Sequence, residues 1–405
     1  MSQPKNMKRI KLCRIVYEFA PDTGGSITHA IDLAKHMAPY CERQFFIVPM
    51  NEKDTSEIDT GFPFEVYRVK YFRFKALQIL RAKFGKWLPI WPLERMSFGF
   101  AALKKCIWIN KNFGLDIIHI HGVDTAPLAS FLRMITKCPI VLMLDGTLYS
   151  VSKRSGIYED ILLRFTNCDH LLVVDDGSSA RTRFQKLRKS HKMTTVYHSI
   201  DTELFFPQKP KELDLKEINI RGSFIIMCMQ ALIPVKGVNY TISAFAEFTK
   251  QFADGDFKLL IIGDGPSRQV LEELSSNMGI QPKVVFLGGI AHSEIPKYLA
   301  LASVFVASAT YSNMVLSVEE AMACAKPVAA FDSGRTAELI IDGKTGLLAR
   351  TGDAKDLAGK LLLLYNDPAL RETLSANAHD FIIKNRTWEK RIDIELGVYR
   401  KLLKA

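Results

Sequence analysis

The sequence has no long uninterrupted apolar run. None of its apolar stretches reaches the roughly 18 residues that a membrane-spanning helix requires, so we do not expect the chain to cross a membrane. Internal repeats and low-complexity segments are also absent, which excludes a repeat architecture. Arg14 and Glu18 interrupt the first apolar stretch, and no small-residue cleavage site follows it. We therefore interpret this stretch as a first strand and not as a signal peptide.

Paired cysteines are lacking as well. The cysteines are odd in number, lie mostly among apolar residues, and form no CxxC pair that would suggest a zinc or redox site. They are Cys13, Cys41, Cys106, Cys138, Cys168, Cys228 and Cys324. This usage is typical of a reducing compartment, so we predict a cytoplasmic protein without a metal site.

The charged residues, in contrast, are predominantly basic. The formal net charge is +11 at pH 7, which favours an anionic partner such as nucleic acid, an anionic membrane or a phosphorylated substrate. Charge alone does not choose among these three.

The chain length and the apolar pattern together indicate the fold class. A chain of 405 residues suits two domains of average size. Short, nearly continuous apolar runs such as DIIHIHG, PIVLMLDG and FKLLIIGDG alternate with helical stretches such as ITHAIDLAKHMAPY. Strands that are buried on both faces of a parallel sheet have this composition. We therefore predict an α/β protein with two parallel sheets.

The alternation lapses at residues 207–222, which read PQKPKELDLKEINIRG. This polar stretch with two prolines is typical of a linker. It places the predicted domain boundary at 206/207, which gives a first domain over 1–206 and a second over 207–385. The remaining residues, 386–405, are helical in character.

Residues 68–95 are basic and aromatic. Eight cations stand against the single acid Glu94, and they alternate with aromatic residues such as Phe72, Phe84 and Trp91. Such a segment suits the surface of an anionic membrane, where the protein would be peripheral on the inner face of the plasma membrane. A solvated basic face over ordinary core aromatics is the alternative. Nucleic acid is not expected as a partner, because no reading module accompanies the charge.

Three glycine-containing turns could carry phosphate chemistry. Gly24 and Gly25 precede an amphipathic stretch, so a diphosphate could approach the backbone at the start of a helix. Lys236 lies between a predicted strand and a predicted helix, where an ammonium could meet the same group. The GDG turn at Gly263 and Gly265 is either a ligand contact or a tight turn.

Residues 308–349 contain the most specific motifs, VEEAMACAKPV and DGKTGLL. With them the chain resembles the retaining glycosyltransferases of the GT-B fold, in particular family 4, and the likeness runs from GGSITHAIDLA through IIHIHG to this segment. The resemblance implies two Rossmann-like domains with parallel sheets facing a cleft, with the nucleotide held mainly by the second domain. It also implies that the helix at 386–405 packs back on the N-terminal domain.

The resemblance implies roles for individual residues. Glu320 corresponds to a glutamate that accepts hydrogen bonds from the ribose hydroxyls, and Lys236 to a lysine that stabilises the leaving diphosphate. His121 matches a position near the transferred sugar. The implied nucleotide-binding set also includes Gly24, Gly25, Asn313, Met314 and Val315.

The chain departs from the family pattern at several positions. The family has a second glutamate where this chain has Ser312, and Glu319 does not replace it because its side chain points elsewhere on the helix. The family arginine five residues before the lysine is Ala231, which removes one cation from the diphosphate. Further departures are Asp145, His198, Ser199 and Ala325.

The implied reaction moves a sugar from a nucleoside diphosphate sugar, UDP- or GDP-linked, to a glycan or lipid-linked acceptor in cell-surface polysaccharide synthesis. Catalytic roles would fall on Lys236, His121 and Ser312, with no protein nucleophile and no cofactor beyond the nucleotide sugar as co-substrate. One alternative is a catalytically degenerate protein that acts as a binding or partner subunit. Another is a different enzyme on the same fold, such as a sugar-nucleotide epimerase.

Overall fold

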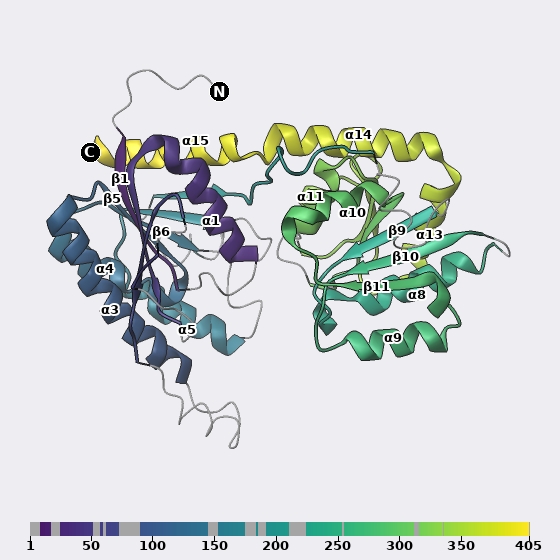
Figure 1. Cartoon of the computed structure of the whole chain (residues 1–405), viewed down its shortest axis with the longest axis horizontal. Coiled ribbons are helices and arrows are strands. Elements are labelled where there is room, and N and C mark those ends of the chain that lie inside the picture. The colour runs from purple at the N-terminus through teal and green to yellow at the C-terminus, as the bar shows by residue number, and fades with distance from the viewer. Residues whose placement is uncertain are drawn as a thin grey trace. The chain divides into compact units, whose positions relative to one another are not determined.

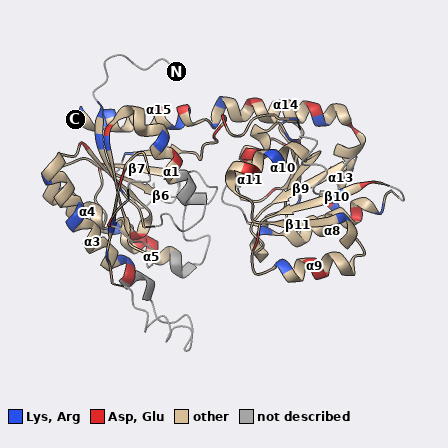
Figure 2. Ribbon diagram, in the orientation of Figure 1, with Lys and Arg blue, Asp and Glu red and all other residues tan. Residues whose placement is uncertain are grey.

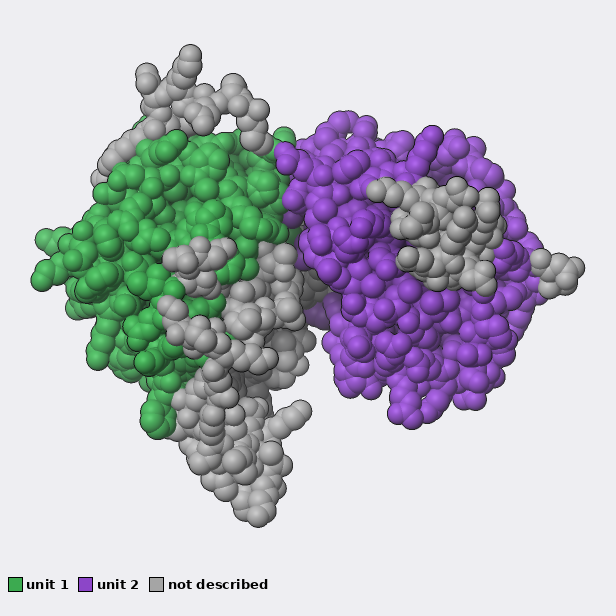
Figure 3. Space-filling view, viewed as in Figure 1, with its two compact units in different colours: residues 1–198, 388–405 green, residues 199–387 purple. Residues whose placement is uncertain are grey.

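The computed structural model describes residues 9–17, 25–51, 57–59, 62–72, 90–144, 153–174, 184, 192–209, 224–252, 255–311, 316–334 and 336–404. The chain divides into two units (Figure 3), the first containing residues 1–198 and 388–405 and the second residues 199–387. These limits differ from the predicted boundaries at 206/207 and 385/386. The first difference has a physical cause, because Ile200 and Phe205 are buried in the core of the second unit.

The first unit is built on a sheet with the strand order β3-β4-β2-β1-β5-β6-β7-β8. All neighbouring strands are parallel except β3 and β4, which are antiparallel. The strands are β1 (Ile10–Ile15), β2 (Cys41–Pro49), β3 (Ile58–Asp59), β4 (Glu65–Val69), β5 (Ile117–His121), β6 (Ile140–Leu144), β7 (His170–Val174) and β8 (Met193–Val196).

Helices cover both faces of this sheet (Figure 1). One face packs against α3 (Ile90–Phe113), α4 (Leu128–Thr136) and α5 (Lys153–Arg164), through residues such as Phe98, Leu132 and Leu163. The other face packs against α1 (Gly25–Met37) and α15 (Trp388–Leu403), through residues such as Leu33 and Leu396. Burying a side chain of this size contributes about 2 kcal/mol. The short 3-10 turns η1 (Ala38–Tyr40) and η2 (Val123–Thr125) complete the unit.

The second unit has a fully parallel sheet with the order β11-β10-β9-β12-β13-β14. This is the doubly wound order of Rossmann folds. The strands are β9 (Phe224–Met229), β10 (Phe257–Ile262), β11 (Val284–Gly288), β12 (Val304–Ala307), β13 (Val328–Phe331) and β14 (Leu347–Ala349).

The helices of the second unit also form two layers. One layer contains α8 (Val238–Thr249), α9 (Arg268–Asn277) and α13 (Ala354–Asn366). The other contains α10 (Ile295–Leu301), α11 (Leu316–Ala323) and α14 (Pro368–Asn385). Local sequence explains how α14 begins: Asp367 accepts a hydrogen bond from Leu370 N–H at 2.8 Å, and Pro368 occupies the first turn, where no N–H is needed. Shorter elements are η4 (Pro234–Lys236), η5 (Gln281–Lys283), η6 (His292–Glu294) and α12 (Thr336–Leu339).

The predicted α/β class with two Rossmann-like parallel sheets is confirmed, because the continuous apolar runs are central strands. Strand β5, for example, is buried along its whole length. The strands that sequence analysis did not predict are β3, β4, β8 and β14. They lie at or next to sheet edges, and β3, β8 and β14 are also shorter than the central strands of the first sheet.

Two further observations concern membrane-spanning helices and the cysteines. Every helix in the described part of the chain is too short or too polar to span a bilayer. All seven cysteines are buried free thiols.

The two segments that connect the units run beside each other within the second unit. Ile200 N–H donates to the Arg386 carbonyl at 2.9 Å, and Ile200 forms an isolated parallel bridge with Thr387. Both connections are therefore tied together by the backbone.

Candidate active site

The second unit brings predicted site residues to one edge of its sheet. The strand order reverses direction between β9 and β12, and ligands of open α/β sheets bind at such a point, outside the carboxyl ends of the strands. Lys236 lies in η4, which follows β9, and Glu320 lies on α11, which follows β12. Both residues therefore belong to the two connections that flank the reversal.

The turn that carries Lys236 is fastened to the end of β12. Gly237 has a φ of +65°, and a Cβ at this position would lie 2.0 Å from the Ser308 carbonyl oxygen. The Ser308 hydroxyl donates to the Gly237 carbonyl at 2.7 Å, and Thr310 N–H donates to the Val235 carbonyl at 3.1 Å. Glycine is therefore required here by both conformation and space.

The Lys236 ammonium is placed where an anion would stabilise it. Its side chain is half-buried, and this burial lowers its pKa. Among the residues that the structure describes, no carboxylate forms an ion pair with it. A half-buried cation without a protein counterion gains most from a bound anion.

Glu320 is held by a histidine that sequence analysis did not predict. Glu320 is 6% exposed, and its Oε1 lies 2.8 Å from His292 Nε2. The His292 ring in turn contacts Phe205, with 5.1 Å between the ring centroids. The available signal was weak: His292 follows the Gly288–Gly289 turn after β11, but nothing in that turn indicates a partner for Glu320.

Glu319 has a different partner from its neighbour. It is fully buried, and Oε1 lies 3.4 Å from Arg386 Nε. Burial raises the pKa of Glu319 to about 8, against the opposing effect of the Arg386 guanidinium. Its carboxyl is thus directed to Arg386, whereas that of Glu320 is directed to His292.

The GDG turn after β10 packs closely against the connection after β9. A Cβ at Gly263 would lie 2.1 Å from the Gln230 carbonyl oxygen, and one at Gly265 would lie 2.5 Å from the Leu232 carbonyl oxygen. Close packing thus explains these glycines without a ligand. Gln230 itself is 7% exposed, and its side-chain amide has no hydrogen-bond partner among the described residues, which makes it an unpredicted candidate for ligand contact.

His121 ends strand β5 in the first unit. Its ring is stacked on His119, with 4.5 Å between centroids, and its Nε2 has no hydrogen-bond partner in the described part of the chain. Burial, followed by His119 and the Arg14 guanidinium, holds the pKa of His121 well below its ordinary value. The ring is therefore neutral at physiological pH.

His119 also belongs to a cluster of buried polar residues, and we call it the Glu395 cluster: Arg14, His119, Arg391, Glu395 and Tyr399. Glu395 lies 2.6 Å from Arg391 and 3.8 Å from Arg14. The Tyr399 hydroxyl donates to Glu395 at 2.9 Å and lies 2.7 Å from His119 Nδ1. Burial opposes ionisation of Glu395, but the Arg391 and Arg14 guanidiniums hold its pKa below the usual range. Helix α15 thus supplies the carboxylate that balances two buried cations.

The remaining predicted residues fall largely outside the described part of the chain. Gly25 is described as the first residue of α1. The others are Gly24, Ser312, Asn313, Met314 and Val315, which lie outside the described residues. Within the described part, no group of three or more His, Cys, Asp or Glu residues could hold a metal ion.

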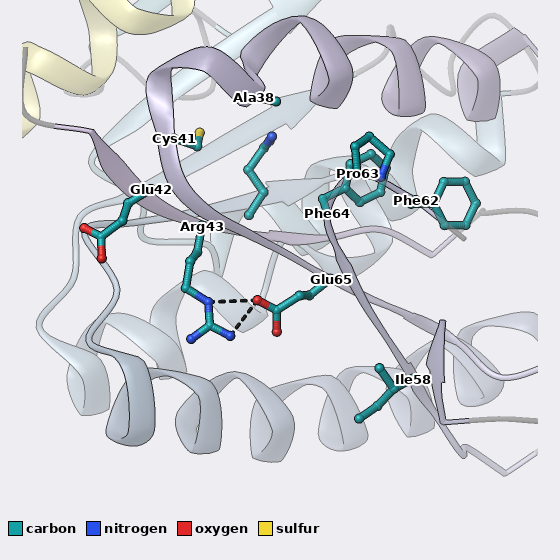
Figure 4. A pocket seen from close by; sticks show the side chains of 10 residues that line it. Ala38, Cys41, Glu42, Arg43, Ile58, Phe62, Pro63, Phe64 and Glu65 are labelled. Carbon is teal, nitrogen blue, oxygen red and sulfur yellow. Dashed lines mark hydrogen bonds and ion pairs between the residues drawn. The ribbon is translucent and has the colours of Figure 1, made fainter. Parts of the chain in front are cut away.

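A cavity of about 380 Å³ lies beside the first sheet, at the amino ends of β2 and β4. Figure 4 shows its lining by Phe62 and Phe64 and by the ion pair between Arg43 and Glu65, whose shortest distance is 2.6 Å. These residues belong to the amino ends of β2 and β4 or precede them, whereas His121 is at the carboxyl end of β5. This cavity is therefore separate from the edge where α/β ligands bind.

A family model matches most of the second unit. Residues 210–381 match the family model described as "Glycosyl transferases group 1". The N-acetyl-alpha-D-glucosaminyl L-malate synthase of Bacillus anthracis is 25% identical over 95% of this chain and 96% of its own length. The GDP-mannose-dependent alpha-(1-6)-phosphatidylinositol monomannoside mannosyltransferase of Mycolicibacterium smegmatis is 29% identical, over 47% of this chain and 52% of its own length.

The fold comparison covers nearly the whole chain. The solved structure of Anabaena HepE in complex with UDP and glucose matches with a TM-score of 0.73 and 18% identity, over 97% of this chain and 100% of that one. At this identity the match concerns the fold.

Proposed function

Because residues 210–381 belong to the glycosyl transferases group 1 family and the chain is a glycosyltransferase of GT-B architecture, we propose that it transfers a sugar from a nucleoside diphosphate sugar with retention at the anomeric carbon. The observation that carries this proposal is the placement of Lys236 and Glu320 in the two connections that flank the strand-order reversal. A cation and a carboxylate at this edge can hold the two polar parts of a nucleoside diphosphate.

Lys236 binds the diphosphate in this proposal. The ammonium is half-buried and has no carboxylate partner among the described residues, so the diphosphate would be its counterion. As the bond to the sugar breaks, negative charge builds on the departing phosphate, and a preorganised cation stabilises that charge more than the ground state. Removing such a group typically slows the reaction by a factor of about 100 to 1000.

Glu320 binds the ribose. A carboxylate accepts hydrogen bonds from two hydroxyl groups at once, and His292 orients this carboxylate from 2.8 Å. The residues proposed to complete the donor site are Gly24, Gly25, Asn313, Met314 and Val315, with Ser312 beside the donor sugar.

His121 is the first unit's contribution to the proposed reaction. Its neutral ring has an Nε2 without a partner among the described residues, so this nitrogen can form a hydrogen bond with a hydroxyl of the sugar. A neutral ring suits this task, because it adds no charge next to the anomeric centre.

Two of the similar proteins support the proposed class of donor. HepE was solved with UDP and glucose, and the Mycolicibacterium smegmatis relative is named as GDP-mannose-dependent. We propose a UDP-sugar or GDP-sugar donor. The same relative is named for a phosphatidylinositol monomannoside, which favours a lipid-linked or glycan acceptor in cell-surface polysaccharide synthesis, on the cytoplasmic side of the membrane.

Calorimetric titration with UDP, GDP and ADP tests the proposal. We expect one nucleotide to bind, and a Glu320→Ala variant to bind it roughly 10- to 100-fold more weakly, the range that corresponds to a lost hydrogen bond to a charged group. The matched control is Glu372→Ala, which removes an exposed carboxylate of α14 in the same unit. This control should leave the affinity unchanged.

A catalytically degenerate binding subunit is the second candidate, and Ala231 in place of the family arginine is the observation that favours it. Hydrolysis of the donor sugar by the purified protein separates the two. Nucleotide binding together with slow donor hydrolysis that Lys236→Ala abolishes supports the transferase. Binding without any turnover supports the degenerate protein, and no binding to any of the three nucleotides contradicts the donor site itself.

A further inference from the structure

The outer surface of α3, α4 and α5 carries large apolar side chains. On α4, Phe131, Met134 and Ile135 have the helical spacing i, i+3, i+4 and are 53–82% exposed. On α5 and directly after its end, Ile157, Ile161 and Phe165 recur every four residues and are 48–71% exposed. Helix α3 adds further apolar side chains on its outer face, Met96, Phe100 and Trp108. We call these nine residues the apolar face.

The three helices form one continuous layer. Helices α3 and α4 pack side by side on the same face of the sheet, as Figure 1 shows. The end of α5 is bonded to α4: the Ser130 hydroxyl donates to the Phe165 carbonyl at 2.7 Å and accepts from Asn167 N–H at 2.8 Å. The six side chains on α4 and α5 together expose on the order of 600 Å². A patch of this size marks an interaction surface and not scattered exposure.

Both basic and acidic residues lie on these helices (Figure 2), but the acidic ones, Glu94 and Asp160 among them, are half-buried or buried. Among the side chains that the structure describes on these three helices and the turn after α4, none of the exposed ones is Asp or Glu. The exposed cations are Lys104, Lys111, Arg133, Lys137 and Arg164. One of them, Arg133, is paired with Asp169 at 2.9 Å.

A basic groove adjoins the apolar face beside α3. It has a volume of about 660 Å³ and lies between α3 and the end of β4. Its lining combines cations with aromatic side chains: Arg68, Lys70, Lys104, Lys105, Phe72 and Phe100. The acid in this lining is Glu57, which lies 3.5 Å from Lys70. The groove thus has room and charge for a phosphate-bearing headgroup.

We propose that the apolar face of α3, α4 and α5 docks on the surface of an anionic lipid bilayer. Apolar side chains between cations match the acyl boundary and the phosphate layer of such a surface. A second copy of this chain would bring like charges together, because the same cations would meet across the interface. Aliphatic side chains such as Met134 and Ile161 do not suit nucleic acid, whose bases prefer aromatic partners.

This inference is independent of the proposed transfer reaction. Of the predicted segment 68–95 it uses the described groove residues Arg68, Lys70 and Phe72. All nine residues of the apolar face are described. The face variants below change only described side chains of α3, α4 and α5 and the adjoining Phe165.

Co-sedimentation of the full chain with vesicles tests it. We expect binding to vesicles of phosphatidylcholine and phosphatidylglycerol in equal parts, at least tenfold weaker binding to pure phosphatidylcholine, and weakening by salt. The double variant Met134→Ser/Phe165→Ser should reduce binding to mixed vesicles at least tenfold. Its matched control is Val270→Ser/Leu363→Ser, which removes apolar side chains of 65% and 51% exposure from α9 and α13.

A charge-reversal pair isolates the electrostatic part. Lys104→Glu/Arg164→Glu should abolish the preference for phosphatidylglycerol. Lys390→Glu/Lys401→Glu makes the same change in net charge on the exposed side of α15, on the opposite face of the sheet, and should have a smaller effect. Nucleotide titration of the same variants should be unchanged, so a failure here is distinct from a failure of the donor site.

Three outcomes would overturn the inference. The first is that the wild-type chain binds neither kind of vesicle. The second is that the control pairs reduce binding as strongly as the face variants. The third is a wild-type dimer in sedimentation equilibrium that Met134→Ser/Phe165→Ser converts to a monomer, which would assign the face to self-association.

Discussion

Lys236 in the second unit is held by backbone contacts between neighbouring connections, whereas His121 in the first unit rests on charged side chains from distant parts of the chain. The Lys236 turn needs only Gly237, Ser308 and Thr310, all of which face backbone groups. The His119–His121 stack depends on the Glu395 cluster, whose members come from β1, β5 and α15. Backbone contacts tolerate changes of side chain, but a buried ionic cluster fails when one charge is lost.

The largest effect is expected when the Glu395 cluster loses its carboxylate. Glu395→Ala leaves the Arg14 and Arg391 guanidiniums buried without a counterion, which should cost about 3 to 5 kcal/mol of the free energy of unfolding. Hydrogen exchange should show the loss in peptides from β1 and β5, with β9 and β10 unaffected. Asp393→Ala, an exposed carboxylate on the same helix, is the control. Equal effects of the two variants would contradict the role of the cluster.

In the second unit, the corresponding change introduces a steric clash and a side chain at an unfavourable backbone conformation. Gly237→Ala places a Cβ against the Ser308 carbonyl oxygen at a positive φ, and we expect a loss of about 2 to 4 kcal/mol together with weaker nucleotide binding. Gly343→Ala is the matched control, because Gly343 has a φ of +69° but no atom within 4 Å of the added Cβ. It should cost only about 1 kcal/mol. If both variants behave alike in urea unfolding, the close approach has no energetic role.

The two units should respond to pH in opposite directions. Buried His119 and His121 have lowered pKa values, so the unfolded state binds more protons below about pH 6.5 and the first unit loses stability as the pH falls. Glu319 has a raised pKa of about 8, so the native state keeps a proton that the unfolded state releases, and the second unit loses stability as the pH rises from about 4.5 to 8. Each effect should be on the order of 1 kcal/mol per pH unit.

Hydrogen exchange at pH 5.5 and 7.5, corrected for intrinsic rates, measures both slopes. Glu319→Gln keeps a hydrogen-bonding group beside Arg386 but cannot ionise, so it should flatten the slope of the second unit alone. A common slope in both units would contradict the assignment of these groups.

The smallest expected effect concerns the turn after α11. Ala325 has a φ of +50°, and Lys326 N–H donates to the Ala321 carbonyl at 2.9 Å, the bond of a left-handed helix end. Ala325→Gly should relieve the strain of the side chain and stabilise the second unit by about 1 kcal/mol. Thermal unfolding would show a small rise of the transition temperature. A lower transition temperature would mean that the methyl group packs favourably.

Local sequence patterns were sufficient to predict the central strands and two of the site residues. Continuous apolar runs predicted the central strands, and Lys236 and Glu320 lie in short motifs next to those strands. His292 was not predicted because only the packed structure shows its contact with Glu320. Gln230 was not predicted because only the packed structure shows that its buried amide has no partner among the described residues. The Glu395 cluster could not be predicted because its members are far apart in the sequence. His119 and Tyr399 are 280 positions apart, and Arg14 looked like an ordinary interruption of an apolar strand.

The placement of α15 in the first unit has a consequence for synthesis on the ribosome. Residues 199–387 form a continuous segment, so the second unit can fold as soon as that segment has emerged. Most of the first unit is translated earlier, but Glu395 is made only after the second unit, so Arg14 lacks this counterion during that interval. Domains commonly fold in the order of their synthesis. In this chain, residues that are translated after the second unit complete the first unit, so we expect the folding order of the two units to be reversed.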